Sequence, residues 1–127
     1  MTNTKDRTDA TIGHTPESVI ETGTDDLLGR KIGHVAVLTF NRPERRNALS
    51  GGVYVGFENA LPAIANDPDI RVLMLTGAGG AFCAGGDVKA MAAAHATGKP
   101  LDPVVRMETQ RISHRNTSLR LYEMSIP

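Results

Sequence analysis

A glycine-rich turn between a strand-like run and a helix-like run constrains this chain more than any other sequence feature. Residues 70–76 read Ile-Arg-Val-Leu-Met-Leu-Thr, an apolar run typical of a buried strand, and a glycine cluster follows at 77–80. Residues 82–89, Phe-Cys-Ala-Gly-Gly-Asp-Val-Lys, then open an alanine-rich helical pattern. Gly85 and Gly86 lack a Cβ, so the backbone N–H groups ahead of the helix are left open. Such donors suit a phosphate, a carboxylate or an oxygen that becomes negative during a reaction.

The usual nucleotide-binding motifs do not fit this turn. If Gly77 and Gly79 began a dinucleotide fingerprint, Phe82 would stand where the third glycine is required. The phosphate-loop motif needs a Gly-Lys-Ser/Thr sequence, which the turn lacks. The residues alone leave two interpretations open: an oxyanion-binding turn, and a glycine turn with a purely structural role.

The pattern around the turn predicts an α/β fold. We expect strands and helices over the following ranges: strands at 27–32, 35–40 and 70–76, and helices at 51–66, 88–95 and 103–123. Ser50 is a good N-cap for the first helix. Pro62 should kink that helix or end it early, because an interior proline costs about 3 kcal/mol. The strand–helix–strand order predicts that the second and third strands share one sheet, with the first helix packed against it.

The chain divides into a tail and one globular part. Residues 1–25 combine many threonines with scattered charges and no aromatic residue, a composition that favours a flexible N-terminal tail. Residues 26–127 carry the strand and helix patterns of the globular part. No apolar run approaches the roughly 20 residues of a membrane span, and no secretory signal pattern is present. We therefore expect a cytoplasmic protein that does not bind a membrane.

Several chemistries are disfavoured by the residues themselves. The 14 basic residues balance the 14 acidic ones, and the arginine-rich pattern at 103–123 has no interleaved aromatics, so nucleic-acid binding is not expected. The four histidines lack the spacing of metal ligands, and we expect them on the surface and no metal site. Cys83 has no histidine nearby in sequence to act as its base, so we interpret it as a small buried side chain and not as a nucleophile.

Two segments together closely resemble the enoyl-CoA hydratase/isomerase, or crotonase, family. One is residues 40–50, Phe-Asn-Arg-Pro-Glu-Arg-Arg-Asn-Ala-Leu-Ser, and the other is residues 81–89, which include the glycine pair. The resemblance extends from about Asp26 to Pro127. It implies the crotonase-like (ClpP/crotonase) fold, a spiral of β-β-α units, of which residues 26–127 would be the N-terminal portion.

The resemblance also implies an activity and a site. Family members bind an acyl-CoA thioester and act as lyases or isomerases, holding the thioester oxygen with two backbone N–H groups while it becomes an enolate. The first of these donors matches Gly86, which is the implied catalytic position. The implied substrate-binding residues are Arg45, Arg46, Ala48, Ala84, Gly85, Gly86, Asp87, Val88 and Lys89. Arginine suits the CoA phosphates because its planar fork pairs with them, and Asp87 also suits the N-cap of the following helix.

The resemblance implies no separate cofactor, because coenzyme A enters as part of the substrate, and it implies a homo-oligomer, trimer or hexamer, for the complete subunit. The sequence departs from the family pattern at residues 125–127, where family members enter a further strand. That strand leads to the second oxyanion donor and the catalytic acids. An alternative is therefore a catalytically incompetent, truncated crotonase fragment with at most residual CoA binding or an assembly role. Hydration, isomerisation, decarboxylation and hydrolysis stay open as reaction classes.

Overall fold

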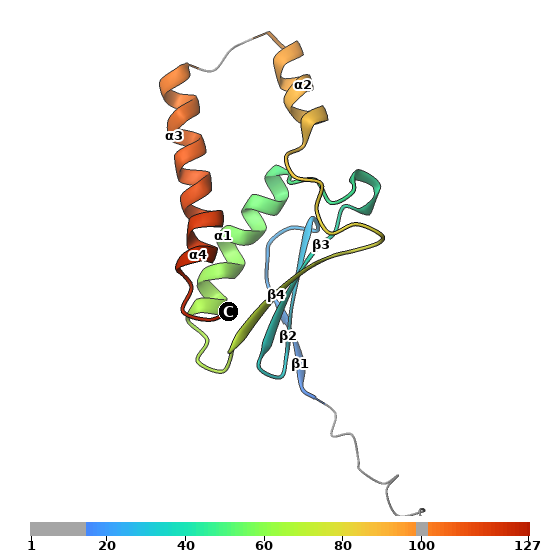
Figure 1. The fold of residues 1–127 in the computed structure, drawn as a ribbon, viewed down its shortest axis with the longest axis vertical. Helices are drawn as coiled ribbons and strands as arrows, with labels where there is room; N and C mark the ends of the chain where they lie inside the picture. The colour runs from blue at the N-terminus through green and yellow to red at the C-terminus, as the bar shows by residue number, and fades with distance from the viewer. Residues whose placement is uncertain (1–14, 99–101) are drawn as a thin grey trace, which may run out of the picture.

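A computed structural model describes residues 15–98 and 102–127 of the chain (Figure 1). Within these residues the strands form one four-stranded sheet in the order β1-β2-β3-β4, and helices pack beside and beyond it. The strands are β1 (Glu17–Ile20), β2 (Leu27–Ile32), β3 (Val35–Phe40) and β4 (Val72–Gly77). The helical segments are η1 (Pro43–Arg45), α1 (Gly51–Ala65), α2 (Val88–Ala96), α3 (Pro103–His114), η2 (Arg115–Leu119) and α4 (Arg120–Glu123).

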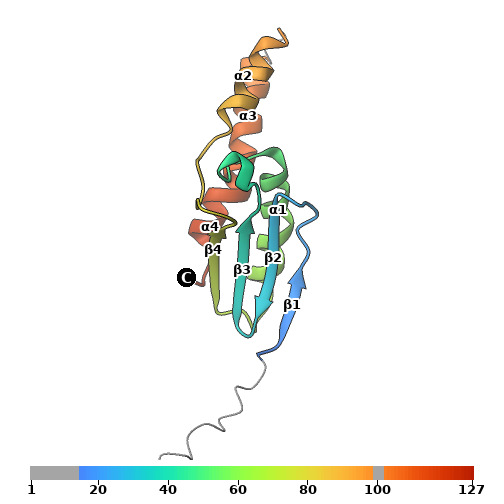
Figure 2. The same cartoon turned by 90° about the vertical axis from the view of Figure 1, so that its right-hand side faces the viewer.

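The sheet is mixed, as the order of its elements requires. β2 pairs antiparallel with β3 through the tight turn at Gly33 and His34, whereas β3 pairs parallel with β4, with Val35 opposite Val72. A parallel pair needs a long crossover, and α1 supplies it along one face of the sheet (Figure 2). The predicted strands and the shared sheet of residues 35–40 and 70–76 are confirmed. Because β3 and β4 run the same way, the segments that follow them emerge at the same edge of the sheet.

The core lies between the sheet and α1. Both elements place large apolar side chains in it at their natural periods, alternate residues on β3 and every third or fourth residue on α1. The side chains of this core are Leu27, Ala36, Leu38, Phe40, Val53, Phe57, Ala60, Leu61, Ile64 and Ile70. The rings of Phe40 and Phe57 meet edge to face with centroids 5.9 Å apart. This packing fixes the end of β3, from which one part of the candidate site begins.

Helix α1 begins where the sequence predicts. The hydroxyl of Ser50 accepts a hydrogen bond from the Val53 N–H at 3.2 Å and so caps the helix. The sequence predicts two outcomes at Pro62. An early end of the helix is wrong, since α1 continues to Ala65, whereas a kink stays a prediction. Leu61 and Ile64, on either side of the proline, are buried in the core, and their burial outweighs the missing backbone hydrogen bond.

The N-terminal stretch differs from the expected flexible tail over Glu17–Ile20, which forms β1. Residues 1–14 of that stretch lie outside the described residues. β1 pairs antiparallel with β2, with Glu17 opposite Ile32 and Ile20 opposite Gly29. The side chains here bury little apolar area, so composition alone favours disorder. An edge strand is ordered instead by backbone hydrogen bonds to the neighbouring strand, and amino-acid composition does not reveal these bonds.

The C-terminal helices form a nearly continuous helical segment from Pro103 to Glu123, with the π-helical turn η2 inside it. Its range agrees with the prediction, but its apolar row of Val105, Ile112 and Leu119 is largely exposed. Figure 1 shows why: α2 and α3 extend beyond the end of the sheet, where there is nothing for them to pack against in the described residues. No helix within the described ranges is both long and apolar enough to cross a membrane.

Removing side-chain atoms from the core should cost far more than removing the same atoms from the outer face of the sheet. Leu38→Ala should lower the free energy of unfolding by about 2–5 kcal/mol, since Leu38 is fully buried against α1. Leu28→Ala removes identical atoms from a side chain that is 41% exposed, and we expect a much smaller loss. Urea unfolding of both variants measures the difference. Equal losses would contradict the assignment of the core to the α1 side.

Candidate functional site

Two segments meet at the edge of the sheet where β3 and β4 end. Residues 41–49 follow β3, and residues 78–87 follow β4. Their backbones are joined by hydrogen bonds from the Ala84 N–H to the Arg46 carbonyl at 3.0 Å and from the Leu49 N–H to the Gly85 carbonyl at 2.8 Å. The structure therefore brings together the two sequence segments that carry the family resemblance.

The side chain of Asn47 ties the start of the glycine-rich segment to the turn after β3. It is 1% exposed. Its Oδ1 accepts a hydrogen bond from the Arg42 N–H at 2.8 Å, and its Nδ2 donates to the carbonyls of Ala78 at 2.9 Å and Ala81 at 2.7 Å. Arg46 and Asn47 both adopt positive φ, at 50° and 56°, a conformation that costs energy for residues with a side chain. Asparagine tolerates it better than most residues, and here its hydrogen bonds compensate.

The other end of the glycine-rich segment is held by an ion pair. Nη1 of Arg42 lies 3.1 Å from Oδ2 of Asp87, and the two side chains are only 15% and 11% exposed. The same Nη1 donates to the Ala48 carbonyl at 3.0 Å. Oδ1 of Asp87 accepts from the Ala90 N–H at 3.0 Å, so Asp87 is also the N-cap of α2, as the sequence predicts.

Asp87 is held in its charged form by these contacts. The Ala90 N–H, and after it the Arg42 guanidinium, lower the pKa of the Asp87 carboxyl below its ordinary value of 3.8, with a smaller contribution from the charge of Arg45. Partial burial acts in the opposite direction but does not prevail. A carboxylate in this state accepts hydrogen bonds at neutral pH and does not donate a proton.

The glycine pair forms the exposed part of the loop. Gly85 has φ +86°, which favours glycine, and its N–H points to Sγ of Cys83 at 3.4 Å. The N–H of Gly86 has no hydrogen-bond acceptor among the residues that the structure describes. Cys83 is partly buried and packs against the core, in keeping with its interpretation as a small apolar side chain. Beside it, Phe82 meets the ring of Phe40 edge to face at 5.4 Å and anchors the loop to the sheet.

The predicted substrate-binding residues fall into two groups. Those close to the loop backbone are Ala48, Ala84, Gly85, Gly86 and Asp87; the exposed ones beside it are Arg45, Arg46, Val88 and Lys89. Ala48 is buried and takes part through its carbonyl. The exposed residues lie at the end of η1 or directly after it, and at the start of α2. Their roles toward CoA stay predictions.

Sequence reasoning missed Arg42 and Asn47, the two side chains that hold the loop at its ends. Both lie inside the segment 40–50, in which the predicted binding residues are the exposed Arg45 and Arg46 between them, together with Ala48. Asparagine one residue before Ala48 carries a usable signal, since asparagine is enriched where the backbone turns left-handed. The Arg42–Asp87 pair spans 45 positions of sequence, and no local pattern indicates it.

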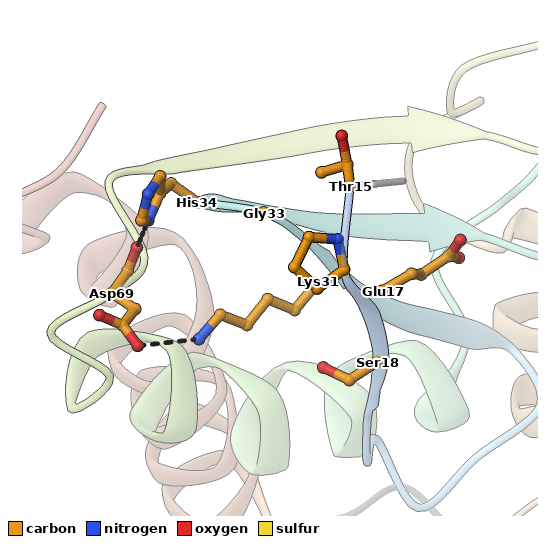
Figure 3. Close-up of a pocket in the computed structure, with 8 residues that line it drawn as sticks. Thr15, Glu17, Ser18, Lys31, Gly33, His34 and Asp69 are labelled. Atoms are coloured by element: carbon orange, nitrogen blue, oxygen red, sulfur yellow. Dashed lines mark hydrogen bonds and ion pairs between the residues drawn. The ribbon is translucent and has the colours of Figure 1, made fainter. Parts of the chain in front are cut away.

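A hollow of about 710 Å³ lies elsewhere, at the β2–β3 hairpin end of the sheet, away from the glycine loop (Figure 3). Three of its lining residues are held by polar contacts: Lys31 lies 2.7 Å from Asp67 and 3.8 Å from Asp69, and Nδ1 of His34 is 2.7 Å from the Asp69 carbonyl oxygen. These contacts fasten the hairpin to the turn before β4. They serve the fold and leave the glycine loop as the candidate site.

Comparison with known proteins finds that this chain is similar to proteins named for reactions of CoA thioesters. The family model for enoyl-CoA hydratase/isomerase matches residues 30–116. An enoyl-CoA hydratase of Mycobacterium tuberculosis, EchA19, is 48% identical over 83 residues, which are 65% of this chain and 29% of that protein. The mitochondrial 3-hydroxyisobutyryl-CoA hydrolase of Rattus norvegicus is 41% identical over 81 residues, 63% of this chain and 21% of that protein. The chain thus spans less than a third of these relatives.

A solved structure agrees with the arrangement of the elements as well as with the sequence. The enoyl-CoA hydratase/isomerase of Xanthobacter autotrophicus superposes with a TM-score of 0.71 at 29% identity, covering 82% of this chain and 37% of that one.

Adding a single methyl group at the end of β4 should disturb the loop. A Cβ at Gly77 would meet the carbonyl oxygens of Ala81 and Phe82 and lie 2.8 Å from Nδ2 of Asn47. We expect Gly77→Ala to destabilise the protein by about 1–3 kcal/mol through overpacking. Gly80→Ala is the control, because a Cβ there meets nothing within 4 Å. Thermal unfolding compares the two, and an unaffected Gly77 variant would refute the close packing of the loop.

The Asp87 carboxylate should make the loop sensitive to acid. Its pKa is lower in the folded protein than in the unfolded chain, so its stabilising contribution is present above about pH 3.8 and is lost as the pH falls through the lower, folded value. Asp87→Asn keeps a capping side chain but removes the charge. The stability difference between wild type and this variant should therefore be largest near neutral pH and shrink on acidification. Urea unfolding across this pH range measures it; a constant difference would contradict the pKa direction.

Proposed function

The chain belongs to the enoyl-CoA hydratase/isomerase family, and we propose that it binds an acyl-CoA thioester and stabilises the thioester enolate through a backbone oxyanion hole. The predicted crotonase fold is confirmed for this N-terminal portion. Gly86 would supply one N–H of the oxyanion hole. The observation that carries the proposal is that the N–H of Gly86 has no acceptor among the described residues, although the carbonyl of the same peptide unit is held by the Leu49 N–H.

The direction of that N–H follows from the geometry of the peptide unit. The Gly85 carbonyl and the Gly86 N–H belong to one planar trans peptide, so they point in opposite directions. The carbonyl points toward the Leu49 N–H, 2.8 Å from the Leu49 nitrogen. The Gly86 N–H therefore points away from residues 46–49, and a thioester oxygen on that side would accept a hydrogen bond from it.

This arrangement serves a reaction in which charge develops on the thioester oxygen. When a nucleophile adds to the β-carbon of an unsaturated acyl group, or a proton leaves the α-carbon, the electron pair moves onto that oxygen. A fixed donor stabilises the charge in the transition state more than it stabilises the neutral thioester, and that difference lowers the barrier. The absent Cβ of Gly86 lets the substrate approach the backbone closely.

The rest of the substrate would lie along the exposed residues beside the loop. We propose that Arg45 and Arg46 pair with the CoA phosphates, since both are exposed after β3 and carry guanidinium groups. Val88 and Lys89, at the start of α2, would border the acyl and CoA path. No separate cofactor is proposed, because CoA arrives with the substrate. We also propose that the complete subunit acts in the cytoplasm as a trimer or hexamer.

A second candidate is a catalytically incompetent crotonase fragment with at most residual CoA binding or an assembly role. The contacts of Asp87, the carboxylate next to the loop glycine, favour it: one oxygen is held by Arg42 and the other by the Ala90 N–H, so this side chain holds the loop and is not free to move a proton. The family name and the two relatives include hydratase, isomerase and hydrolase activities, so the reaction class is a separate question. Incubation with crotonyl-CoA separates the candidates: loss of the conjugated double bond or release of free CoA supports the enzyme, and binding without turnover supports the fragment.

Removing the Gly86 N–H should abolish most of the activity. Gly86→Pro deletes the donor, and losing one such donor costs about 10²–10³ in kcat. Gly86→Ala keeps the N–H, and its Cβ would meet only the mobile end of Met91 at 3.1 Å, so this variant should stay active. Turnover of crotonyl-CoA by the natural full-length protein tests both variants, with folding checked by circular dichroism.

Cys83→Ala is the third variant of the series and should change turnover little, because the thiol packs against the core. Full activity of the proline variant, or loss of activity in the cysteine variant alone, would exclude the oxyanion assignment and favour a cysteine mechanism.

A further inference from the structure

We propose that Arg42 polarises and positions the Gly86 N–H through a chain of hydrogen bonds that crosses two peptide units. The proposal rests on the oxyanion role of Gly86 and extends it to a residue outside the predicted site. Arg42 itself would not touch the substrate. It would act through the backbone of residues 48–49 and 85–86.

The first link joins the guanidinium to the segment after β3. Nη1 of Arg42 donates to the carbonyl of Ala48 at 3.0 Å. That carbonyl shares a peptide unit with the N–H of Leu49. A cation at the carbonyl oxygen draws electron density from the unit and makes the N–H at its other end a stronger donor.

The second link joins that peptide to the loop. The Leu49 N–H donates to the Gly85 carbonyl at 2.8 Å, and this carbonyl shares a peptide unit with the Gly86 N–H. The hydrogen bonds thus run in one direction, from the guanidinium through two peptides to the free donor. Chains of this kind strengthen each of their members. The last donor of this series of hydrogen bonds is the Gly86 N–H, which has no acceptor in the described residues. The substrate oxygen would bind there.

Burial and charge make the link effective. The Arg42 side chain is 15% exposed, so water screens its charge little. Asp87 and, at 3.8 Å, Asp26 hold the guanidinium in place. Nη1 of Arg42 contacts both the Asp87 carboxylate and the Ala48 carbonyl. Arg42 therefore fixes Asp87 directly and the peptide unit of residues 85–86 through the hydrogen bonds described above.

Two CoA derivatives can isolate the effect. Butyryl-CoA presents the thioester oxygen, and S-butyl-CoA has a methylene group in place of the carbonyl, so only the former accepts from Gly86. The wild-type full-length protein should bind butyryl-CoA about threefold to tenfold more tightly than S-butyl-CoA, which is the effect of one hydrogen bond on the dissociation constant. Arg42→Met should lose most of this preference and keep its affinity for S-butyl-CoA. Calorimetric titration measures both dissociation constants, and circular dichroism checks folding.

The matched control is Arg71→Met, the same change at an exposed arginine whose side chain makes no hydrogen bond or ion pair with the described residues; its preference should equal that of wild type. Arg42→Gln keeps an amide donor without the charge and should also lose preference, which keeps the test valid if Arg42→Met does not fold.

An unchanged preference in both Arg42 variants would overturn the proposal, and so would a parallel loss of affinity for both ligands. If the wild type shows no preference, the oxyanion role of Gly86 fails first, and the role of Arg42 fails with it.

Discussion

The arrangement of the site depends on the buried amide of Asn47. Its two N–H groups and its oxygen bind three backbone groups from two segments that lie more than 30 positions apart in sequence. Replacing it with a side chain that cannot donate would leave the Ala78 and Ala81 carbonyls without these partners, and burying unpaired polar groups is costly. The left-handed backbone at Arg46 and Asn47 exists because this network holds it there. The glycine loop thus takes its shape from the turn after β3.

The core and the polar contacts of the loop have different roles in building the site. The parallel pairing of β3 and β4 delivers both segments to one edge of the sheet, and the core under α1 keeps that edge rigid. Asn47 then fixes the start of the loop, Arg42 fixes its end at Asp87, and two backbone hydrogen bonds hold the middle. In the described residues this leaves the N–H of Gly86, a residue without a side chain, with no acceptor beside a fixed peptide carbonyl. A donor that is fixed before the substrate arrives needs no reorganisation during the reaction.

Sequence reasoning found the elements of the fold and the two segments of the site, because both depend on local patterns. The ranges of β2, β3 and α1 follow from apolar periodicity, and Ser50 and Asp87 follow from capping preferences. The pairing of β1 and the roles of Arg42 and Asn47 depend on contacts across the fold, which local patterns do not encode. The apolar row of Val105, Ile112 and Leu119 is exposed in the described residues, and the sequence could not show this, because periodicity shows which face is apolar but not what covers it.

The central claim is that the Gly86 N–H receives the thioester oxygen. Nuclear magnetic resonance of ¹⁵N-labelled protein tests it directly, since a backbone proton moves downfield when its N–H forms a hydrogen bond. On titration with butyryl-CoA, the Gly86 amide proton should move strongly downfield. On titration with S-butyl-CoA, which lacks the carbonyl oxygen, it should move little although the CoA part still binds. Equal shifts with the two ligands, or no shift at Gly86 with either, would contradict the account.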